Sequence, residues 1–282
     1  MEILWDNLDS AAWRGTTPLQ QSWEYGQAMA ALGAGVRRAQ VFLDGQEVAR
    51  AQVLHRRGLR LILRGPLWLA LPEPRARRAV LRRLARHAAP TIATPAEAVP
   101  GFGVLPLITP RHHALWDLTP DPAALRAGLS GKWRNRLVRA EAQVAPRRAN
   151  PARALEPLLA AEEAQRGQRG YRALPPAFAR LWPGSRQVWE WHSAGRMQAA
   201  MLILRHGTWA SYHIGWAGPA ARAAFAHGPM LWQAALALRA EGVRTFDLGD
   251  VNAEDAPGLA HFKLGTGAAL TPLGPTALVL PG

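Results

Sequence analysis

The chain of 282 residues contains no cysteine. This excludes disulfides, thiolate nucleophiles, iron–sulfur clusters and zinc sites built on cysteine. The chain also has no apolar run near the roughly 20 residues that a membrane-spanning helix needs. The best candidate, residues 59–71, contains Arg60, Arg64 and Pro66. The first ten residues are acidic where a secretory signal is basic, so we expect a cytoplasmic protein without integral membrane association.

Lysine is nearly absent, although the chain has a net charge of +14. Of the 34 basic residues only Lys132 and Lys263 are lysines, and the rest are arginines. A compact ammonium whose pKa can shift is not equivalent to a planar guanidinium. We therefore interpret both lysines as candidate functional positions, with chance survival as the alternative.

Apolar residues make up 49% of the chain, enough for a substantial core, so a disordered chain is excluded. The positive charge gathers in the middle. Residues 121–200 carry 14 basic and 6 acidic side chains, whereas residues 201–282 carry five of each. An anionic partner near the middle is one interpretation. A solvated basic surface is the other, and charge alone favours it.

One order of elements occurs twice along the chain: a helix, three strands separated by turn signals such as Asp44-Gly45 and Ala194-Gly195, and a second helix. The second copy is followed by a buried-looking strand. The first copy comprises a helix at 21–32, strands at 39–43, 48–55 and 59–63, and a helix at 73–87. The second comprises a helix at 154–165, strands at 188–191, 197–204 and 208–214, a helix at 228–240 and a strand at 245–248.

This repeat predicts an α/β (α+β) protein of two equivalent lobes, residues 1–120 and 121–282. Each lobe is expected to hold a mixed, largely antiparallel sheet, because hairpins are followed by a strand–helix–strand crossover. The proline-rich stretch 95–110 is the expected linker, with a strand at 112–118 near the junction.

A polar helix is predicted at 131–143. Helical spacing puts Lys132, Arg136 and Arg139 on one face. A second face carries Trp133, Leu137 and Ala140. The cationic face either meets solvent or binds phosphates, and the pattern alone favours solvent.

Four segments resemble one known superfamily. They are QSWEYGQAM from residue 21, KWRNRLVRAEAQ from 132, YHIGWAG from 212 and FDLGDVNAEDAPGLAHFKLGTGA from 246. Together they resemble the FemABX aminoacyltransferases and related acyltransferases of the GNAT fold. The resemblance implies two tandem GNAT-like lobes, here without the coiled-coil insertion of some members.

The resemblance further implies transfer of an aminoacyl group from charged tRNA, or of an acyl group from coenzyme A, to an amine. In tRNA-using members a Phe-Lys pair lies beside the reacting ester, and Phe262 and Lys263 match it. Aminolysis builds negative charge on the carbonyl oxygen, which a fixed ammonium stabilises, and the attacking amine must lose a proton. Lys263 fits the first of these roles, or a contact with the donor's terminal phosphates.

The other candidate catalytic residues are Asp247, Asp250 and Tyr212. The two aspartates stand where a strand ends, a usual place for site residues in open α/β sheets, and Tyr212 could relay a proton. For acceptor binding the candidates are Trp23, Tyr25, His213 and Asn252. Packing is the alternative for the aromatic residues and for His213, and an Asx turn is the alternative for Asn252.

The candidate donor-binding residues are Lys132, Arg134, Arg136, Gly228, Gly265 and Gly267, the glycines because they permit close backbone approach. Two departures from the family matter. No lysine follows the first motif, which disfavours a peptidoglycan precursor as acceptor. The coenzyme A loop is degenerate, with one glycine and Pro229 in residues 224–229.

The sequence therefore favours an N-acyltransferase that takes an aminoacyl group from aminoacyl-tRNA to a small amine, peptide or lipid-linked acceptor. The alternatives are an acyl-coenzyme A-dependent N-acyltransferase and an inactive RNA- or anion-binding module of the same fold. We expect no cofactor beyond the donor. We also expect no metal site, because His112 and His113 point to opposite faces of a strand.

Overall fold

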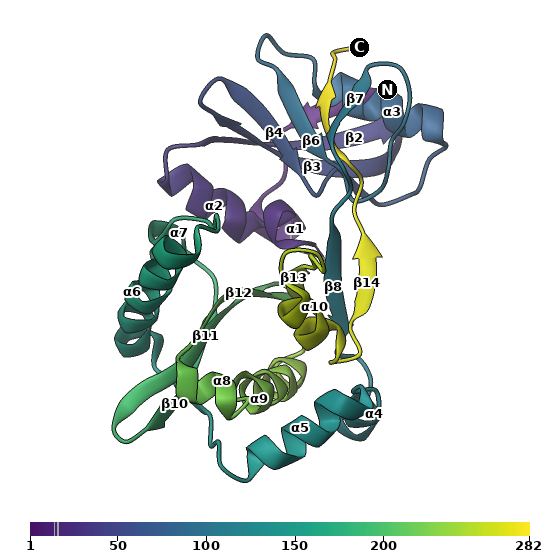
Figure 1. The fold of residues 1–282 in the computed structure, drawn as a ribbon. Helices are drawn as coiled ribbons and strands as arrows, with labels where there is room; N and C mark the ends of the chain where they lie inside the picture. The colour runs from purple at the N-terminus through teal and green to yellow at the C-terminus, as the bar shows by residue number, and fades with distance from the viewer. Residues whose placement is uncertain (14, 16) are drawn as a thin grey trace. The chain divides into compact units, whose positions relative to one another are not determined.

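The computed structural model describes residues 1–13, 15 and 17–282. The chain divides into two compact units. Unit 1 comprises residues 1–112, 181–183 and 271–282, and unit 2 comprises residues 113–180 and 184–270. Each unit is built on its own sheet (Figure 1).

The sheet of unit 1 has the order β1-β2-β3-β4-β6-β15-β7, with β5 beside β3. Its helix α3 buries Val80, Leu81 and Leu84, the apolar stripe expected there. The strands are β1 (Glu2–Trp5), β2 (Gly35–Leu43), β3 (Gln46–Arg56), β4 (Leu59–Leu63), β5 (Leu67–Trp68), β6 (Thr91–Thr94), β7 (Val104–Ile108) and β15 (Thr276–Val279). The helices are α1 (Ser10–Trp13), the 3-10 helix η1 (Leu19–Gln21), α2 (Trp23–Ala31) and α3 (Pro74–Leu84).

The second sheet has the order β14-β8-β13-β12-β11-β10-β9. Its strands are β8 (His112–Asp117), β9 (Arg147–Ala149), β10 (Arg186–Ser193), β11 (Arg196–His206), β12 (Trp209–Ala217), β13 (Thr245–Asp250) and β14 (Ala269–Pro272). The helices of unit 2 are α4 (Pro122–Ala127), α5 (Gly131–Glu141), α6 (Pro151–Arg169), α7 (Pro176–Arg180), α8 (Pro219–Ala223), α9 (His227–Ala240) and α10 (Pro257–Leu264).

The predicted repeat is confirmed in the strand pairing. In unit 1 β4 pairs parallel with β6 after the crossover through α3, and in unit 2 β12 pairs parallel with β13 after α9. The other registers described are antiparallel. The leading hairpins turn at Asp44-Gly45 and Ala194-Gly195, where all four residues have positive φ between 49° and 81°. Such two-residue turns match the twist of paired strands.

The units differ from the predicted boundaries because each sheet takes one strand from the part of the sequence assigned to the other lobe. β15, near the C-terminus, pairs with β6 in the first sheet. β8, which follows the first repeat, pairs with β13 in the second. The two strands thus fill equivalent positions beside the crossover strand, so contacts place residues 113–120 in unit 2 and 271–282 in unit 1.

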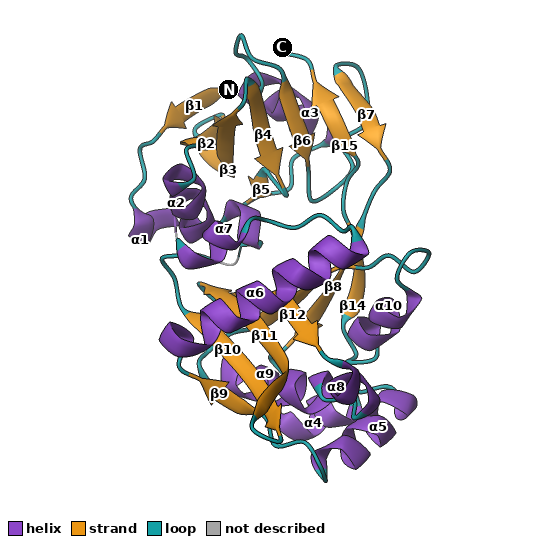
Figure 2. Cartoon of the chain, turned by 60° about the vertical axis from the view of Figure 1, so that its left-hand side comes forward, coloured by secondary structure: helices purple, strands orange, loops and turns teal. Residues whose placement is uncertain are grey.

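Two helices cover the sheet of unit 2. The helix α6 lies across one face of β10–β12, and α9 packs on the other (Figure 2). The core on the α9 side includes Met201 and Ile203 of β11 and Leu231 and Leu238 of α9. Sheet residues alternate between faces, so β11 supplies both layers.

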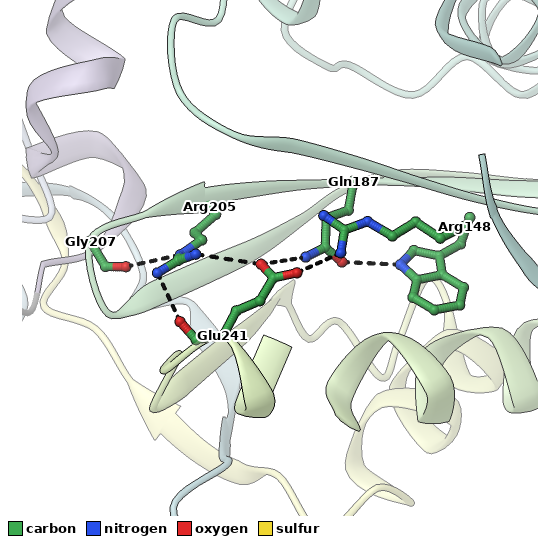
Figure 3. Close-up of polar contacts among 6 residues, drawn as sticks. Arg148, Gln187, Arg205, Gly207 and Glu241 are labelled. Carbon is green, nitrogen blue, oxygen red and sulfur yellow. Dashed lines mark hydrogen bonds and ion pairs between the residues drawn. The ribbon is translucent and has the colours of Figure 1, made fainter. Parts of the chain in front are cut away.

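A polar network ties the end of α9 to the sheet. Glu241 lies between Arg148 and Arg205 and pairs with both (Figure 3). The same carboxylate accepts a 3.0 Å hydrogen bond from Gln187, and Arg205 donates a 2.9 Å bond to the Glu241 backbone oxygen. Three strands are thereby connected to one helix terminus.

No helix in the described parts of the chain combines the length and the apolar character that crossing a membrane requires.

Candidate functional site

The strands β12 and β13 pair over only three residues, from Trp209 to Ser211 with Thr245 to Asp247. Beyond that point each strand carries an irregularity. The register of β12 against β11 shifts at His213, and that of β13 against β8 shifts between Asp247 and Asp250. Gly249, in the second shift, has φ +82°. Such bulges redirect side chains and are common beside active sites.

Lys263 extends from α10 to the end of β13. Its Nζ donates a 2.6 Å hydrogen bond to the backbone oxygen of Asp250, and the side chain is only 7% exposed. Burial lowers the pKa of Lys263, while the charges of Asp250 and Asp247 act in the opposite direction. The last of the four family-like segments, which begins at residue 246, therefore holds a desolvated ammonium next to the end of β13. Such a group interacts more strongly with developing negative charge than it would in water.

Asp247 forms a dyad with His113 of β8. The Nδ1 atom of His113 lies 3.0 Å and 3.3 Å from the two carboxylate oxygens, and Asp247 is 3% exposed. Asp247 also accepts a 2.8 Å hydrogen bond from the Gly249 amide. A carboxylate on Nδ1 fixes the hydrogen there, so the neutral ring carries its acceptor at Nε2. Among the described residues, no group of three His, Asp or Glu could hold a metal ion.

The two predicted residues of β12 are half-buried by solvent accessibility. Burial raises the pKa of the Tyr212 hydroxyl and lowers that of His213 from 6.5 to about 4. The His213 ring stacks obliquely on Phe178 of α7, with centroids 5.3 Å apart. The Tyr212 hydroxyl lies over Gly215, where an added Cβ would be 1.8 Å away. Both side chains are therefore uncharged at neutral pH, and a glycine makes room for one of them.

Phe262 belongs to an aromatic cluster that joins α10, α5 and the start of α9. Its ring lies 6.1 Å from Trp133, 6.0 Å from Phe225 and 6.3 Å from His227. Trp133 also donates a 3.0 Å hydrogen bond to the Phe262 backbone oxygen. The Arg136 guanidinium lies 4.2 Å from the centre of the Phe225 ring. The cluster thus connects the Phe-Lys pair to the basic helix.

The predicted two faces of α5 are confirmed. Trp133, Leu137 and Ala140 are buried. The cations Lys132, Arg134, Arg136 and Arg139 are exposed. Arg134 reaches the Ala127 backbone oxygen at 3.4 Å. The exposed face therefore offers four positive charges on consecutive turns.

The three glycines predicted to admit a ligand lie against protein atoms. A Cβ on Gly228 would be 2.2 Å from the Phe225 ring, and its N–H already donates to the Phe225 oxygen. A Cβ on Gly265 would be 2.5 Å from the Trp133 indole, and one on Gly267 would be 2.8 Å from the Gly128 oxygen. In this structure the three glycines lie against Phe225, the Trp133 indole and the C-terminal end of α4. Their part in donor binding stays a prediction.

The remaining acceptor candidates are buried or contact other residues of their own units. In unit 1 the Arg38 guanidinium lies 3.5 Å over the Trp23 ring, and Tyr25 is 3% exposed. In unit 2 the Asn252 side-chain oxygen accepts from the amides of Glu254 and Asp255, and its amide donates to the Asp255 carboxylate at 2.7 Å. This is the Asx-turn alternative for Asn252.

Sequence reasoning missed three residues of this region: His113, Phe225 and His227. The strand predicted at 112–118 contained His113, but only its pairing with β13 brings it to Asp247. Burial lowers the pKa of His227, which lies at the start of α9 against the Ala200 carbonyl at 3.4 Å. Phe225 has a positive φ of 54°, a conformation that nothing in the sequence predicts.

Comparisons with known proteins agree with this fold. A family model described as an acetyltransferase (GNAT) domain matches residues 125–264. The crystal structure of FemX superposes with a TM-score of 0.77 at 15% identity and covers 99% of this chain and 98% of its own. No curated protein sequence matches the chain.

Two further structures share the fold. The C-terminal domain of a putative lysylphosphatidylglycerol synthetase from Agrobacterium fabrum gives a TM-score of 0.59 at 14% identity, covering 94% of this chain and 87% of that domain. A tandem GNAT protein from the clavulanic acid biosynthesis pathway gives 0.53 at 17% identity, covering 98% and 97%. The region matched by the GNAT domain model lies almost entirely in unit 2, and over its full length the chain has the tandem fold of FemX and of the tandem GNAT protein.

Proposed function

We propose that this protein transfers an aminoacyl group from aminoacyl-tRNA to an amine acceptor in the cytoplasm, without a cofactor. The observation that carries the proposal is the position of Lys263. Its buried ammonium is fixed at the end of β13, and the adjoining Phe262 is connected through Trp133 to the cationic helix α5. One continuous set of side chains thus links the exposed cationic face of α5 to a group suited to carbonyl chemistry.

The donor end of the proposal rests on α5. Lys132, Arg134 and Arg136 are exposed on one short helix, with no carboxylate partner among their described contacts. Arginine and lysine bind nucleic-acid phosphates and release counterions, which makes such binding steeply salt-dependent. We assign these three residues to the tRNA backbone.

An acyl-coenzyme A donor is less well supported by the start of α9. A helix N-terminus binds pyrophosphate through free backbone N–H groups. Here the Gly228 N–H donates to the Phe225 oxygen at 2.9 Å, and Pro229 has no N–H. Two of the donors that this helix start would offer are therefore lost.

In the proposed reaction the acceptor amine attacks the ester carbonyl, the C–N bond forms, and the tRNA ribose oxygen leaves. The Lys263 ammonium stabilises the negative charge on the carbonyl oxygen. Asp247 fixes His113, while Asp250 fixes Lys263 through its backbone oxygen. The amine proton passes to the leaving oxygen, with the Tyr212 hydroxyl as the proposed relay.

The names of two structures that share the fold support our proposal for the acceptor class. FemX and the lysylphosphatidylglycerol synthetase are related in fold, and the second name refers to a lipid product. We propose a small amine, a peptide or a lipid-linked amine. Trp23, Tyr25, His213 and Asn252 stay predictions as its contacts, because their described partners lie within the protein.

The test compares donors directly. Purified protein is titrated with charged tRNA and with acetyl-coenzyme A at several salt concentrations. We expect saturable tRNA binding that weakens by an order of magnitude or more between low and moderate salt. The variant Lys132→Ala/Arg134→Ala/Arg136→Ala should bind more weakly and with a flatter salt dependence.

The matched control is Arg153→Ala/Arg169→Ala/Arg172→Ala, which removes the same charge from exposed positions outside α5. It should retain the wild-type affinity and slope. Equal losses of affinity in both triple variants would show that tRNA binding depends on the overall positive charge of the protein and not on α5. Binding of acetyl-coenzyme A but not of tRNA would favour the coenzyme A-dependent alternative and overturn the proposal.

A further inference from the structure

Unit 1 contains a basic cavity of its own, distinct from the site in unit 2. Its volume is about 280 Å³. The side chains used in the argument are Trp5, Arg37, His55, Arg60, Arg86 and His87, all from residues 1–112.

The cavity lies on one face of the sheet, where three strands bring their residues into a row. Gly35 of β2 is paired with His55 of β3, and His55 is paired with Arg60 of β4. Directly paired residues share a face, and so do residues two apart, which adds Arg37. Gly35 contributes no side chain, so the row is hollow at its first position.

Arg60 forms the buried part of this cavity. It is 6% exposed, and its Nη1 atom has no hydrogen-bond partner among the described residues. Burial lowers the pKa of Arg60, and the neighbouring charge of Arg37 lowers it further. A guanidinium is nevertheless charged in proteins, and buried charges are normally paired. The unsatisfied donor of Arg60 indicates a missing anionic partner.

Apart from Gly35 and Val53, the rest of the lining is cationic or aromatic. Trp5 lies within 4.9 Å of the Arg37 guanidinium and 5.7 Å of that of Arg60. The Nδ1 atom of His87 accepts the Ala89 amide at 3.0 Å, so its neutral ring carries the hydrogen on Nε2 as a donor. Asp6 binds Arg37 at 2.7 Å, but no acidic side chain is among the described residues that line the cavity.

We propose that this cavity binds a phosphate group of a small molecule. Guanidinium forks bind phosphate by paired, charge-assisted hydrogen bonds, and the lining offers three arginines within one enclosure. The volume lies just below the range of about 300–1,000 Å³ that is typical of ligand pockets. It therefore fits a phosphate or diphosphate with a small substituent, and the exposed Arg86 and His87 form its rim.

The experiment is calorimetric titration with inorganic pyrophosphate, and with citrate as a carboxylate of comparable charge. Arg60→Gln should weaken pyrophosphate binding by about tenfold or more, because a charged hydrogen-bond donor is lost. Arg86→Gln, at the exposed rim, should weaken it several-fold without affecting folding. The matched control Arg83→Gln removes an exposed arginine from the last turn of α3, outside the lining, and should bind as the wild type does.

Three results would overturn the proposal: no pyrophosphate binding at low salt, an equal loss in Arg83→Gln, or tighter binding of citrate than of pyrophosphate. Thermal melts of each variant distinguish lost binding from lost folding. If Arg60→Gln does not fold, the binding measured for Arg86→Gln tests the proposal in its place. Lys263→Met should bind pyrophosphate normally, so this result is independent of the aminoacyl-transfer proposal.

Discussion

The ammonium of Lys263 is held 2.6 Å from the backbone oxygen of Asp250, which joins α10 to the end of β13. The same ammonium lies near Gly249, whose added Cβ would be 3.6 Å from Nζ. A residue in this position contributes to folding through its hydrogen bond as well as to chemistry through its charge. Substitutions must therefore separate the two contributions.

Replacing Lys263 by Met removes the ammonium and keeps an unbranched apolar stem. We expect single-turnover acyl transfer to fall by about a hundredfold or more, since a fixed positive group near the developing oxyanion is lost. Lys263→Arg should restore little of the transfer rate, because the larger planar guanidinium cannot take the position of the ammonium. Near-normal transfer by Lys263→Met would remove the ammonium from the mechanism. Thermal melts should show a modest destabilisation of about 1 kcal/mol from the lost hydrogen bond.

Gly215 determines where the Tyr212 hydroxyl lies. Gly215→Ala places a methyl group where Tyr212 now is, at 1.8 Å, so the ring must move. If Tyr212 takes part in transfer, we expect activity to fall by about tenfold or more, because small displacements at a reacting centre are costly. Gly167→Ala in α6, with open space around it, is the control and should keep full activity. Full activity in Gly215→Ala would show that the position of Tyr212 is unimportant.

Protonation of His213 should destabilise the protein in mild acid. Its pKa is lowered from 6.5 to about 4 in the folded chain by burial. Between these values the unfolded chain binds the extra proton, so stability falls as the pH falls through this window, by up to about 1.4 kcal/mol per pH unit. His213→Phe, which can keep the contact with Phe178, should lose less melting temperature between pH 7.5 and 4.5 than the wild type. An identical loss in both proteins would contradict the assignment.

Glu241 is predicted to stabilise unit 2 through its three side-chain partners. Glu241→Ala leaves Arg148, Arg205 and Gln187 without their shared acceptor (Figure 3). We expect a loss of about 1–2 kcal/mol in the free energy of unfolding, reduced by the partial exposure of the pairs. Denaturant titration provides the measurement. Glu163→Ala, which removes a single exposed pair with Arg166, should change stability by less than about 0.5 kcal/mol.

The sequence by itself determined the local elements and their order. Hydrophobic periodicity located the strand Leu59–Leu63, and the predicted faces of α5 match its burial. The Asp44-Gly45 and Ala194-Gly195 turns marked equivalent hairpins in both units. These features depend on neighbours within a few residues, which is why the chain order reveals them. The scarcity of lysine likewise points to Lys263 from the sequence alone.

Only the tertiary structure decided which distant segments meet. The pair of His113 and Asp247 spans 134 positions, and the bond from Trp133 to Phe262 spans 129. The exchange of β8 and β15 between the sheets depends on the same kind of contact. Strand register is set by which faces become buried together, a property of the assembled sheet that no single segment carries. For the same reason, only the tertiary structure shows that Gly228, Gly265 and Gly267 lie against Phe225, Trp133 and the Gly128 backbone.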